Sequence, residues 1–206
     1  MPRNRREGRR DGAHAASDGR ALRDRTLIAQ TTARLIAEHG LTDWSAAKRK
    51  AARQLALPDS AALPSNDDIE QALLDYHALF GGEAHAESLR QQRRHALHWM
   101  RRLRAWQPLL VGGVAAGWAS AHSDVRIEVV ADDPKAVEMA LASEGIVYAA
   151  LPARDDDTTQ LRIDTPAASV RVSVLTPVQR RQRPRKDDEP RLDAAAVEAL
   201  LDPEPT

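Results

Sequence analysis

The chain has 206 residues, enough for one ordinary domain with a helical extension and tails. Its 30 Lys and Arg residues balance its 30 Asp and Glu residues, so no overall charge draws it towards nucleic acid or membrane. Because it contains no cysteine, disulfides, thiolate zinc sites, iron–sulfur clusters and cysteine nucleophiles are excluded. Residues 1–12 lack the apolar segment of a signal peptide, and no apolar run approaches the ~20 residues of a membrane helix. We therefore expect a cytoplasmic protein with no membrane partner.

The first half of the chain is predicted to be helical. Residues 1–22 are rich in Arg, Gly, Asp and Ser and almost free of apolar residues, so we expect a disordered basic tail. Residues 23–107 carry apolar positions at helical spacing and form the predicted helical region. The helices expected there cover residues 24–40, 44–55, 65–80 and 84–106.

The sequence pattern changes at Pro108, after which short apolar strands alternate with helices. The order β-α-β-α-β-β-β over residues 108–176 predicts a small mixed sheet, and residues 177–206 resemble a linker with a short C-terminal helix. The fold class is therefore expected to be α+β, with a helical N-terminal region followed by the mixed sheet. The expected strands are 109–111, 125–130, 146–151, 158–163 and 169–175, and the expected helices are 114–120, 134–144 and 194–201.

A pair of glycines separates the first two predicted strands. Gly112 and Gly113 follow a short buried strand, and Ser123 and Asp124 precede the second. Glycines let backbone N–H groups approach a triphosphate, and carboxylates hold the magnesium ions that bridge its oxygens. Two carboxylates at positions i and i+2 of a strand lie on one face, about 6.6 Å apart. Here Arg126 occupies the i+2 position after Asp124.

This arrangement resembles the nucleotidyltransferase superfamily, which includes polymerase-β-like and minimal nucleotidyltransferases. Their pattern is a hydrophobic residue, Gly, Gly or Ser, about ten residues, and then Asp-hydrophobic-Asp. More loosely, residues 26–200 resemble a group of bacterial nucleotidyltransferase-like proteins through the stretch AKRKAARQL and through SDVRIEVV in place of SDIDLQLF. The resemblance implies a nucleotidyltransferase-like domain over residues 108–176.

The resemblance also implies that two of three metal ligands are lost. Asp124 fills the first position, whereas Arg126 fills the second. The third family carboxylate comes from a later strand, expected here at residues 169–175. In that strand Val170, Val172 and Val174 are predicted to face inward, and the outward residues Arg171 and Ser173 are not acids. We therefore expect a degenerate metal site.

Three functional hypotheses follow. The first is a degenerate member that binds a nucleotide or phosphate ligand through Gly112, Gly113, Ser123 and Arg126, or works through a protein partner. The second is an active Mg-dependent nucleotidyltransferase, in which Asp124 binds magnesium and an unidentified acid serves the second metal. The third is a nucleic-acid-binding module that uses the basic N-terminal tail and the helix near Lys48.

The polar face that carries Arg126 allows two interpretations. Arg126 and Arg171 could bind phosphate directly, replacing the charge of metal ions with guanidinium groups. Alternatively, the face is solvated, and its acids and arginines pair across the strands. Both interpretations stay open at this point.

Other polar and aromatic residues are less specific. His95 and His98 are three residues apart on a predicted helix, which suits metal geometry, but no third ligand is evident and we expect solvent-facing histidines. His122 would contact phosphate or carry a proton only in a functional site, and is otherwise a loop residue. The remaining aromatic candidates are predicted to anchor the core or an interface: Trp99, Trp106 and Trp118.

Overall fold

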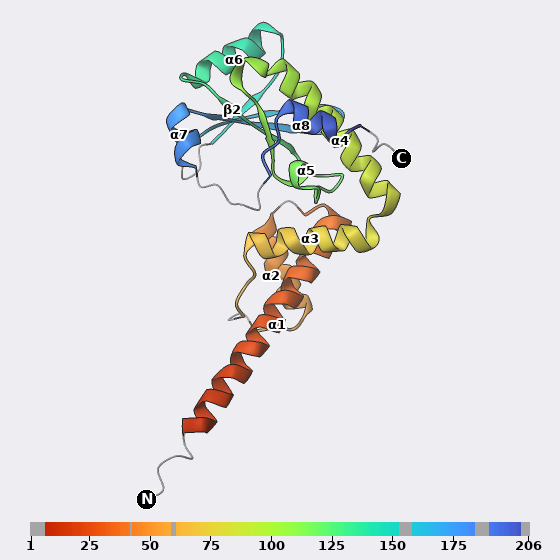
Figure 1. Cartoon of the computed structure of the whole chain (residues 1–206), viewed down its shortest axis with the longest axis vertical. Helices are drawn as coiled ribbons and strands as arrows, with labels where there is room; N and C mark the ends of the chain where they lie inside the picture. The colour runs from red at the N-terminus through yellow and green to blue at the C-terminus, as the bar shows by residue number, and fades with distance from the viewer. Residues whose placement is uncertain (1–6, 42, 59–60, 153–157, 184–189, 203–206) are drawn as a thin grey trace, which may run out of the picture. The chain divides into compact units, whose positions relative to one another are not determined.

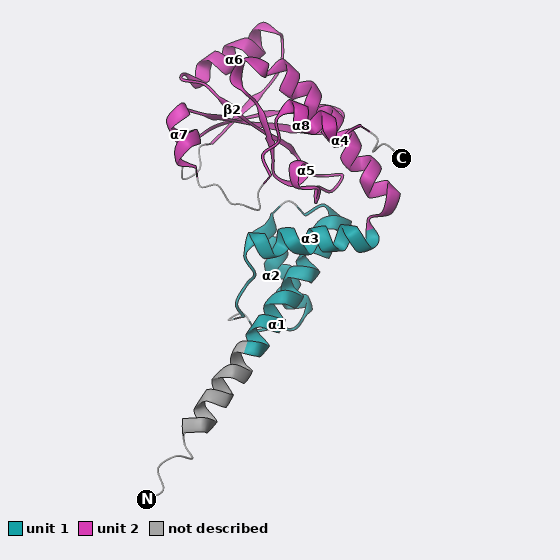
Figure 2. Cartoon of the chain, viewed as in Figure 1, with its two compact units in different colours: residues 1–80 teal, residues 81–206 magenta. Residues whose placement is uncertain are grey.

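The computed structural model describes residues 7–41, 43–58, 61–152, 158–183 and 190–202, with side chains described from residue 19 onward. The chain divides into two compact units, residues 1–80 and 81–206 (Figures 1 and 2). The predicted disordered tail over residues 1–22 lies mostly outside the residues whose side chains are described. No helix in the described part is long and apolar enough to cross a membrane.

In its described residues the first unit has three helices, and the second and third of them begin with polar caps. At the start of the second helix, the Asp43 side chain accepts a hydrogen bond from the backbone N–H of Ala46. Before the third helix, Ser65 and Asp68 exchange side chain–backbone hydrogen bonds of 2.8 and 3.0 Å, which form a capping box. The helices are α1 (Glu7–His39), α2 (Trp44–Gln54) and α3 (Asn66–Phe80).

The second unit contains a five-stranded mixed sheet, which confirms the predicted α+β class. The strand order is β1-β2-β5-β4-β3. The pair β2 and β5 is parallel, whereas the other neighbouring strands are antiparallel. The strands are β1 (Leu109–Val111), β2 (Val125–Val130), β3 (Ala149–Leu151), β4 (Thr159–Ile163) and β5 (Val170–Leu175).

The second unit also contains the long helix that follows the first 81 residues. This helix, α4 (Gly82–Arg102), shares a hydrophobic core with the sheet, so it belongs to the second unit rather than to the N-terminal helices. The helix after the glycine pair is shorter than expected, because Gly117 adopts a φ of +92° and ends it. The other helices are α5 (Gly113–Ala116), α6 (Pro134–Ser143), α7 (Pro177–Gln182) and α8 (Ala194–Ala199), with a 3₁₀ turn over Arg104–Trp106.

The alternation of side chains along β2 and β5 gives the sheet one apolar and one polar face. Apolar residues of both strands are buried together with residues of α4, α6 and α8, which cover this face (Figure 1). The inward positions predicted for β5 are confirmed. The polar positions between them point to the opposite face. The buried positions are Val125, Ile127, Val129, Val170, Val172 and Val174.

Replacing Ile127 by Ala should destabilise the second unit by about 2–5 kcal/mol, because the side chain is fully buried in the middle of β2. Denaturant unfolding of the full chain would measure this change. Val147→Ala is the matched control, since Val147 is 87% exposed and its truncation should change stability by less than about 0.5 kcal/mol. Equal effects of the two substitutions would contradict the assigned strand faces.

Candidate functional site

The glycine pair between β1 and α5 has two separate structural roles. Gly112 has φ +70° and ψ −155°, a backbone conformation that essentially only glycine adopts. Gly113 instead packs against Trp118, because a Cβ atom on Gly113 would lie 2.7 Å from the indole ring. The turn therefore needs both glycines whether or not it binds a ligand, and the glycines alone do not demonstrate phosphate binding.

Ser123 and Asp124 lie at the entrance to β2 and are both partnered. The Ser123 hydroxyl oxygen accepts a hydrogen bond of 3.0 Å from the backbone N–H of Ser120 and so stabilises the turn that precedes the strand. Asp124 accepts a hydrogen bond of 2.7 Å from Nη2 of Arg171 on the neighbouring strand β5. Asp124 is thus held by an arginine at the position where the resemblance implies a metal.

The register of the three central strands brings three arginines into one row. Arg126 of β2 lies opposite Arg171 of β5, and Arg171 lies opposite Arg162 of β4. We call Arg126, Arg171 and Arg162 the arginine row. The row runs across the polar face of the sheet, beside the glycine turn: a Cβ atom on Gly112 would lie 3.2 Å from Cδ of Arg126.

An acidic side chain directly after β4 lies beside the arginine row. Asp164 forms an ion pair of 3.0 Å with Arg162 and accepts a hydrogen bond of 2.6 Å from the Ser169 hydroxyl. The Ser169 hydrogen bond and the charge of Arg162 lower the pKa of Asp164. Asp164 is therefore engaged by Arg162 and Ser169 and is not an open ligand for a metal ion.

Glu128 is the most buried acid of the polar face, with 5% of its surface exposed. One carboxylate oxygen lies 2.8 Å from Nη1 of Arg183, close enough for an ion pair but without hydrogen-bond alignment. Its Oε2 atom and Nε of Arg171 are both buried without a hydrogen-bond partner among the described residues. Sequence reasoning missed Arg183, because it lies just after α7 in a segment that resembles a linker.

The residues of this face do not fit a two-magnesium site. Magnesium prefers oxygen ligands, and several of them are usually carboxylates or waters. Asp124 is engaged by Arg171, and the side chain two positions along the strand is the cation of Arg126. Throughout the described ranges, no group of three or more His, Cys, Asp or Glu side chains is arranged to hold a metal ion.

The histidine and tryptophan candidates have structural roles. His95 Nε2 lies 3.1 Å from Oγ1 of Thr165, and its ring makes an edge contact with Trp99. The expectation of a solvent-facing residue is therefore wrong for His95, which packs against the turn after β4, and correct for His98, which is exposed. Trp99 and Trp118 are both 6% exposed, which confirms their predicted place in the core.

No family model matches the chain, and no curated protein matches it. Two solved structures of the Cid1 poly(U) polymerase, one with MgGTP bound and one bound to MgATP, are similar at 15% and 16% identity, each with a TM-score of 0.35. Each match covers 56% of this chain and 40% of the polymerase chain, so this chain spans about two fifths of that protein. We draw no conclusion about ligands or activity from a likeness of this extent.

Gly113→Ala should lower the thermal stability of the second unit, because the added methyl group would push into the Trp118 ring at 2.7 Å. Overpacking of this kind costs about 1–3 kcal/mol. Gly19→Ala is the control, since nothing lies within 4 Å of the added atom and alanine favours the helix. An unchanged melting temperature for Gly113→Ala would show that the Trp118 ring does not pack tightly against Gly113.

Stability should fall as the pH drops below the ordinary histidine value of about 6.5. Burial lowers the pKa of His95, so the unfolded chain takes up a proton at a pH where the folded chain does not. His95→Gln should show a shallower loss of melting temperature between pH 7 and pH 5 than the natural protein. A steeper or unchanged profile in His95→Gln would contradict this assignment.

Proposed function

We propose that the second unit is a nucleotidyltransferase-like domain that binds a phosphate-bearing ligand, of which a nucleotide is the class that the resemblance implies. Binding takes place on the polar face of the sheet, next to the Gly112–Gly113 turn. The proposal depends on the register of β2 and β5, which sets Arg126 beside Arg171. The resemblance implies metal-binding carboxylates on these two strands. Metal-dependent transfer is not part of the proposed function.

Guanidinium groups are well suited to this role. Arginine is always charged and presents planar, paired donors that match the oxygens of a phosphate. Arg126 passes directly over the glycine turn, and Nε of Arg171 is buried without a hydrogen-bond partner in the described part of the chain. Asp124 orients Arg171 through the 2.7 Å hydrogen bond, so this guanidinium is held ready for a second acceptor.

A purely structural role accounts for the ion pairs of this face. An ion pair across two strands contributes about 0.2–1 kcal/mol, and Asp124 and Arg171 form one. Two cations directly opposite each other are destabilising, however, and Arg126 and Arg171 occupy paired positions. A bound anion would offset this repulsion, and it would therefore also raise the melting temperature of the protein.

The same charges oppose metal-dependent transfer. A divalent cation at Asp124 would lie near Arg171, which contacts that carboxylate, and near the cation two positions along β2. Like charges at such short range repel strongly wherever water screens them poorly. For this reason we assign no residue a role in catalysis and propose binding alone.

Calorimetric titration of the full chain with ATP and with inorganic triphosphate should give the same affinity in magnesium and in a chelator. Arg126→Gln should weaken binding roughly tenfold or more, because hydrogen bonds to charged groups contribute about 1.5–3 kcal/mol. Arg181→Gln is the matched control, since Arg181 is an exposed arginine of α7. Equal weakening in both variants would reduce the effect to overall charge and contradict a site at Arg126.

A double substitution tests the ancestry of the site separately. Arg126→Asp combined with Arg171→Asp would put carboxylates at position 124 just before β2, at position 126 on β2 and at position 171 on the adjacent strand. This variant should acquire magnesium-dependent ATP binding, whereas Arg162→Asp, one strand further away, should not. Magnesium-dependent binding by the natural protein would overturn the proposal of a degenerate site. Absence of any phosphate binding would favour a role through a protein partner.

A further inference from the structure

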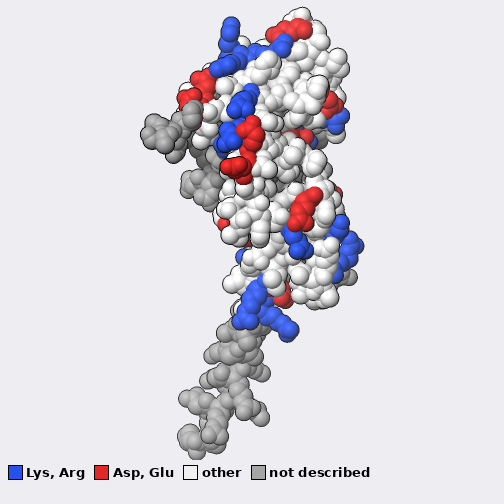
Figure 3. All heavy atoms as spheres, turned by 90° about the vertical axis from the view of Figure 1, so that its right-hand side faces the viewer, with Lys and Arg blue, Asp and Glu red and all other residues white. Residues whose placement is uncertain are grey.

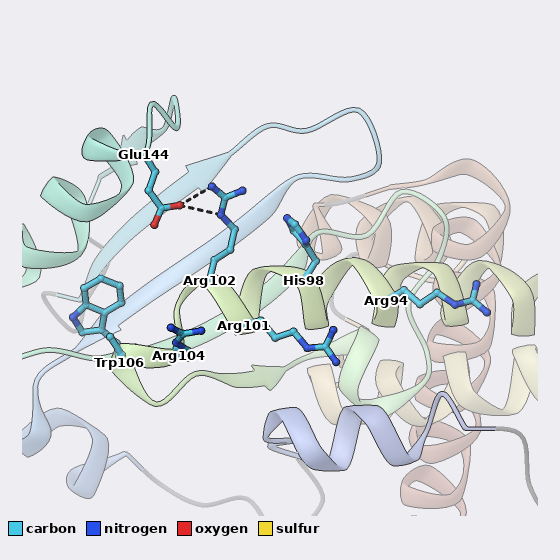
Figure 4. Close-up of a pocket in the computed structure, with 8 residues that line it drawn as sticks. Arg94, His98, Arg101, Arg102, Arg104, Trp106 and Glu144 are labelled. Carbon is cyan, nitrogen blue, oxygen red and sulfur yellow. Dashed lines mark hydrogen bonds and ion pairs between the residues drawn. The ribbon is translucent and has the colours of Figure 1, made fainter.

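A second cationic surface lies at the C-terminal end of α4. It is a hollow of about 620 Å³ lined by Arg94, Arg101, Arg102, Arg104, Trp106 and Glu144, among others (Figure 4). We call it the α4 hollow. Because α4 packs on the apolar face of the sheet, the α4 hollow is separate from the arginine row on the polar face.

The helix presents its cations in a line. Arg94, Arg101 and Arg102 follow the i, i+7, i+8 spacing that places side chains on one side of a helix, and the His98 side chain lies at i+4 on the same side. The stretch from Arg94 to Arg102 rises about 12 Å along the helix axis at 1.5 Å per residue. A line of this length suits a chain of anionic groups better than one isolated phosphate.

The α4 hollow carries an excess of positive charge. Among its lining residues, four arginines face one carboxylate, that of Glu144, which accepts two hydrogen bonds from Arg102 at 2.6 and 3.1 Å. Arg101 pairs with Glu198 at 2.7 Å. Arg104 has no ion-pair partner in the part of the chain that the structure describes. The whole chain has no net charge, and basic and acidic side chains are interspersed over the face that Figure 3 shows, so this excess is local.

The existing ion pairs leave these arginines available to a ligand. The side chains of Arg94, Arg101 and Arg102 are 38–65% exposed. Exposed pairs contribute little to stability and are screened by salt, so a phosphate can replace a carboxylate partner at small cost. Arg94, whose contact with Glu87 is 3.4 Å long, is the most weakly held of the three.

An aromatic side chain adds a second kind of contact. Trp106 is half-buried and packs against the hydrophobic core, which fixes the ring, and it also lines the hollow beyond the end of α4 (Figure 4). Proteins that bind single-stranded nucleic acid combine a positively charged groove for the backbone with aromatic rings on which bases stack. In a duplex the bases are stacked inside, so only an unpaired base can reach such a ring.

We propose that the α4 hollow binds single-stranded nucleic acid, with the arginines of α4 and the following turn on the phosphates and Trp106 against a base. This surface differs from the N-terminal tail and from the helix near Lys48, where the sequence suggested a nucleic-acid site. It is also independent of the ligand proposed for the arginine row.

Fluorescence anisotropy of the full chain with a labelled single-stranded oligonucleotide of about 15 nucleotides tests the proposal. Arg94→Gln combined with Arg104→Gln should raise the Kd about tenfold at moderate salt. The slope of log affinity against log salt should fall by about 0.7 for each lost phosphate contact, and so by about 1.4. Lys135→Gln combined with Arg181→Gln removes the same charge from exposed positions of the same unit and should change neither quantity.

Two further measurements separate the possible ligands and sites. An abasic strand of equal length should bind at least about fivefold more weakly, since base–aromatic stacking contributes about 1–3 kcal/mol per base. The loss caused by Arg94→Gln with Arg104→Gln should be the same in the natural protein and in the Arg126→Gln background, because independent sites give additive effects; failure here is therefore distinguishable from failure at the arginine row. The proposal is wrong if the two double variants lose the same oligonucleotide affinity, or if the abasic strand binds as tightly as the normal strand. It is also wrong if polyglutamate, an anionic chain without bases, binds more tightly than the oligonucleotide.

Discussion

The parallel pairing of β2 with β5 is the constraint on which the described architecture of the second unit depends. It sets Val125, Ile127 and Val129 against the valines of β5 and buries them under α4, α6 and α8. Because side chains alternate along a strand, every residue between these positions must face the other side. Burial of one face thus determines the composition of the other, and a shift of one residue would bury the arginines.

Positive charge dominates the centre of that polar face. In a two-metal site, bound cations would supply the positive charge and carboxylates would hold them. Here guanidinium groups are part of the chain itself, and Asp124 serves as a partner for Arg171 rather than as an open ligand. The glycine turn persists beside them for reasons of backbone conformation and of packing on Trp118. Because the hydrophobic core of this unit lies on the apolar face, the side chains of the polar face contribute little to its fold.

Helix α4 has an apolar side and a cationic side. Its apolar side, with Leu97, Met100 and Leu103 at its end, closes the core over the sheet. Its arginines are tied to α6 and α8 by exposed ion pairs with Glu144 and Glu198. Exposed ion pairs of this kind contribute little to the stability of the fold, so an arginine can exchange its carboxylate partner for another anion. The cationic side of α4 can therefore bind a ligand without disturbing the core on its other side.

The sequence alone determined the α+β class, the five strands, the inward valines of β5 and the polar positions between them, because these follow from local periodicity and turn residues. It also identified Arg126 as the cation at the position where the resemblance implies an acid. Tertiary structure decided the strand register, and with it the row formed by Arg126, Arg171 and Arg162. It likewise decided that α4 packs on the sheet, that His95 contacts Thr165 and that Arg183 reaches Glu128. These contacts join residues far apart along the chain, and no local pattern specifies which distant segments a buried face will meet.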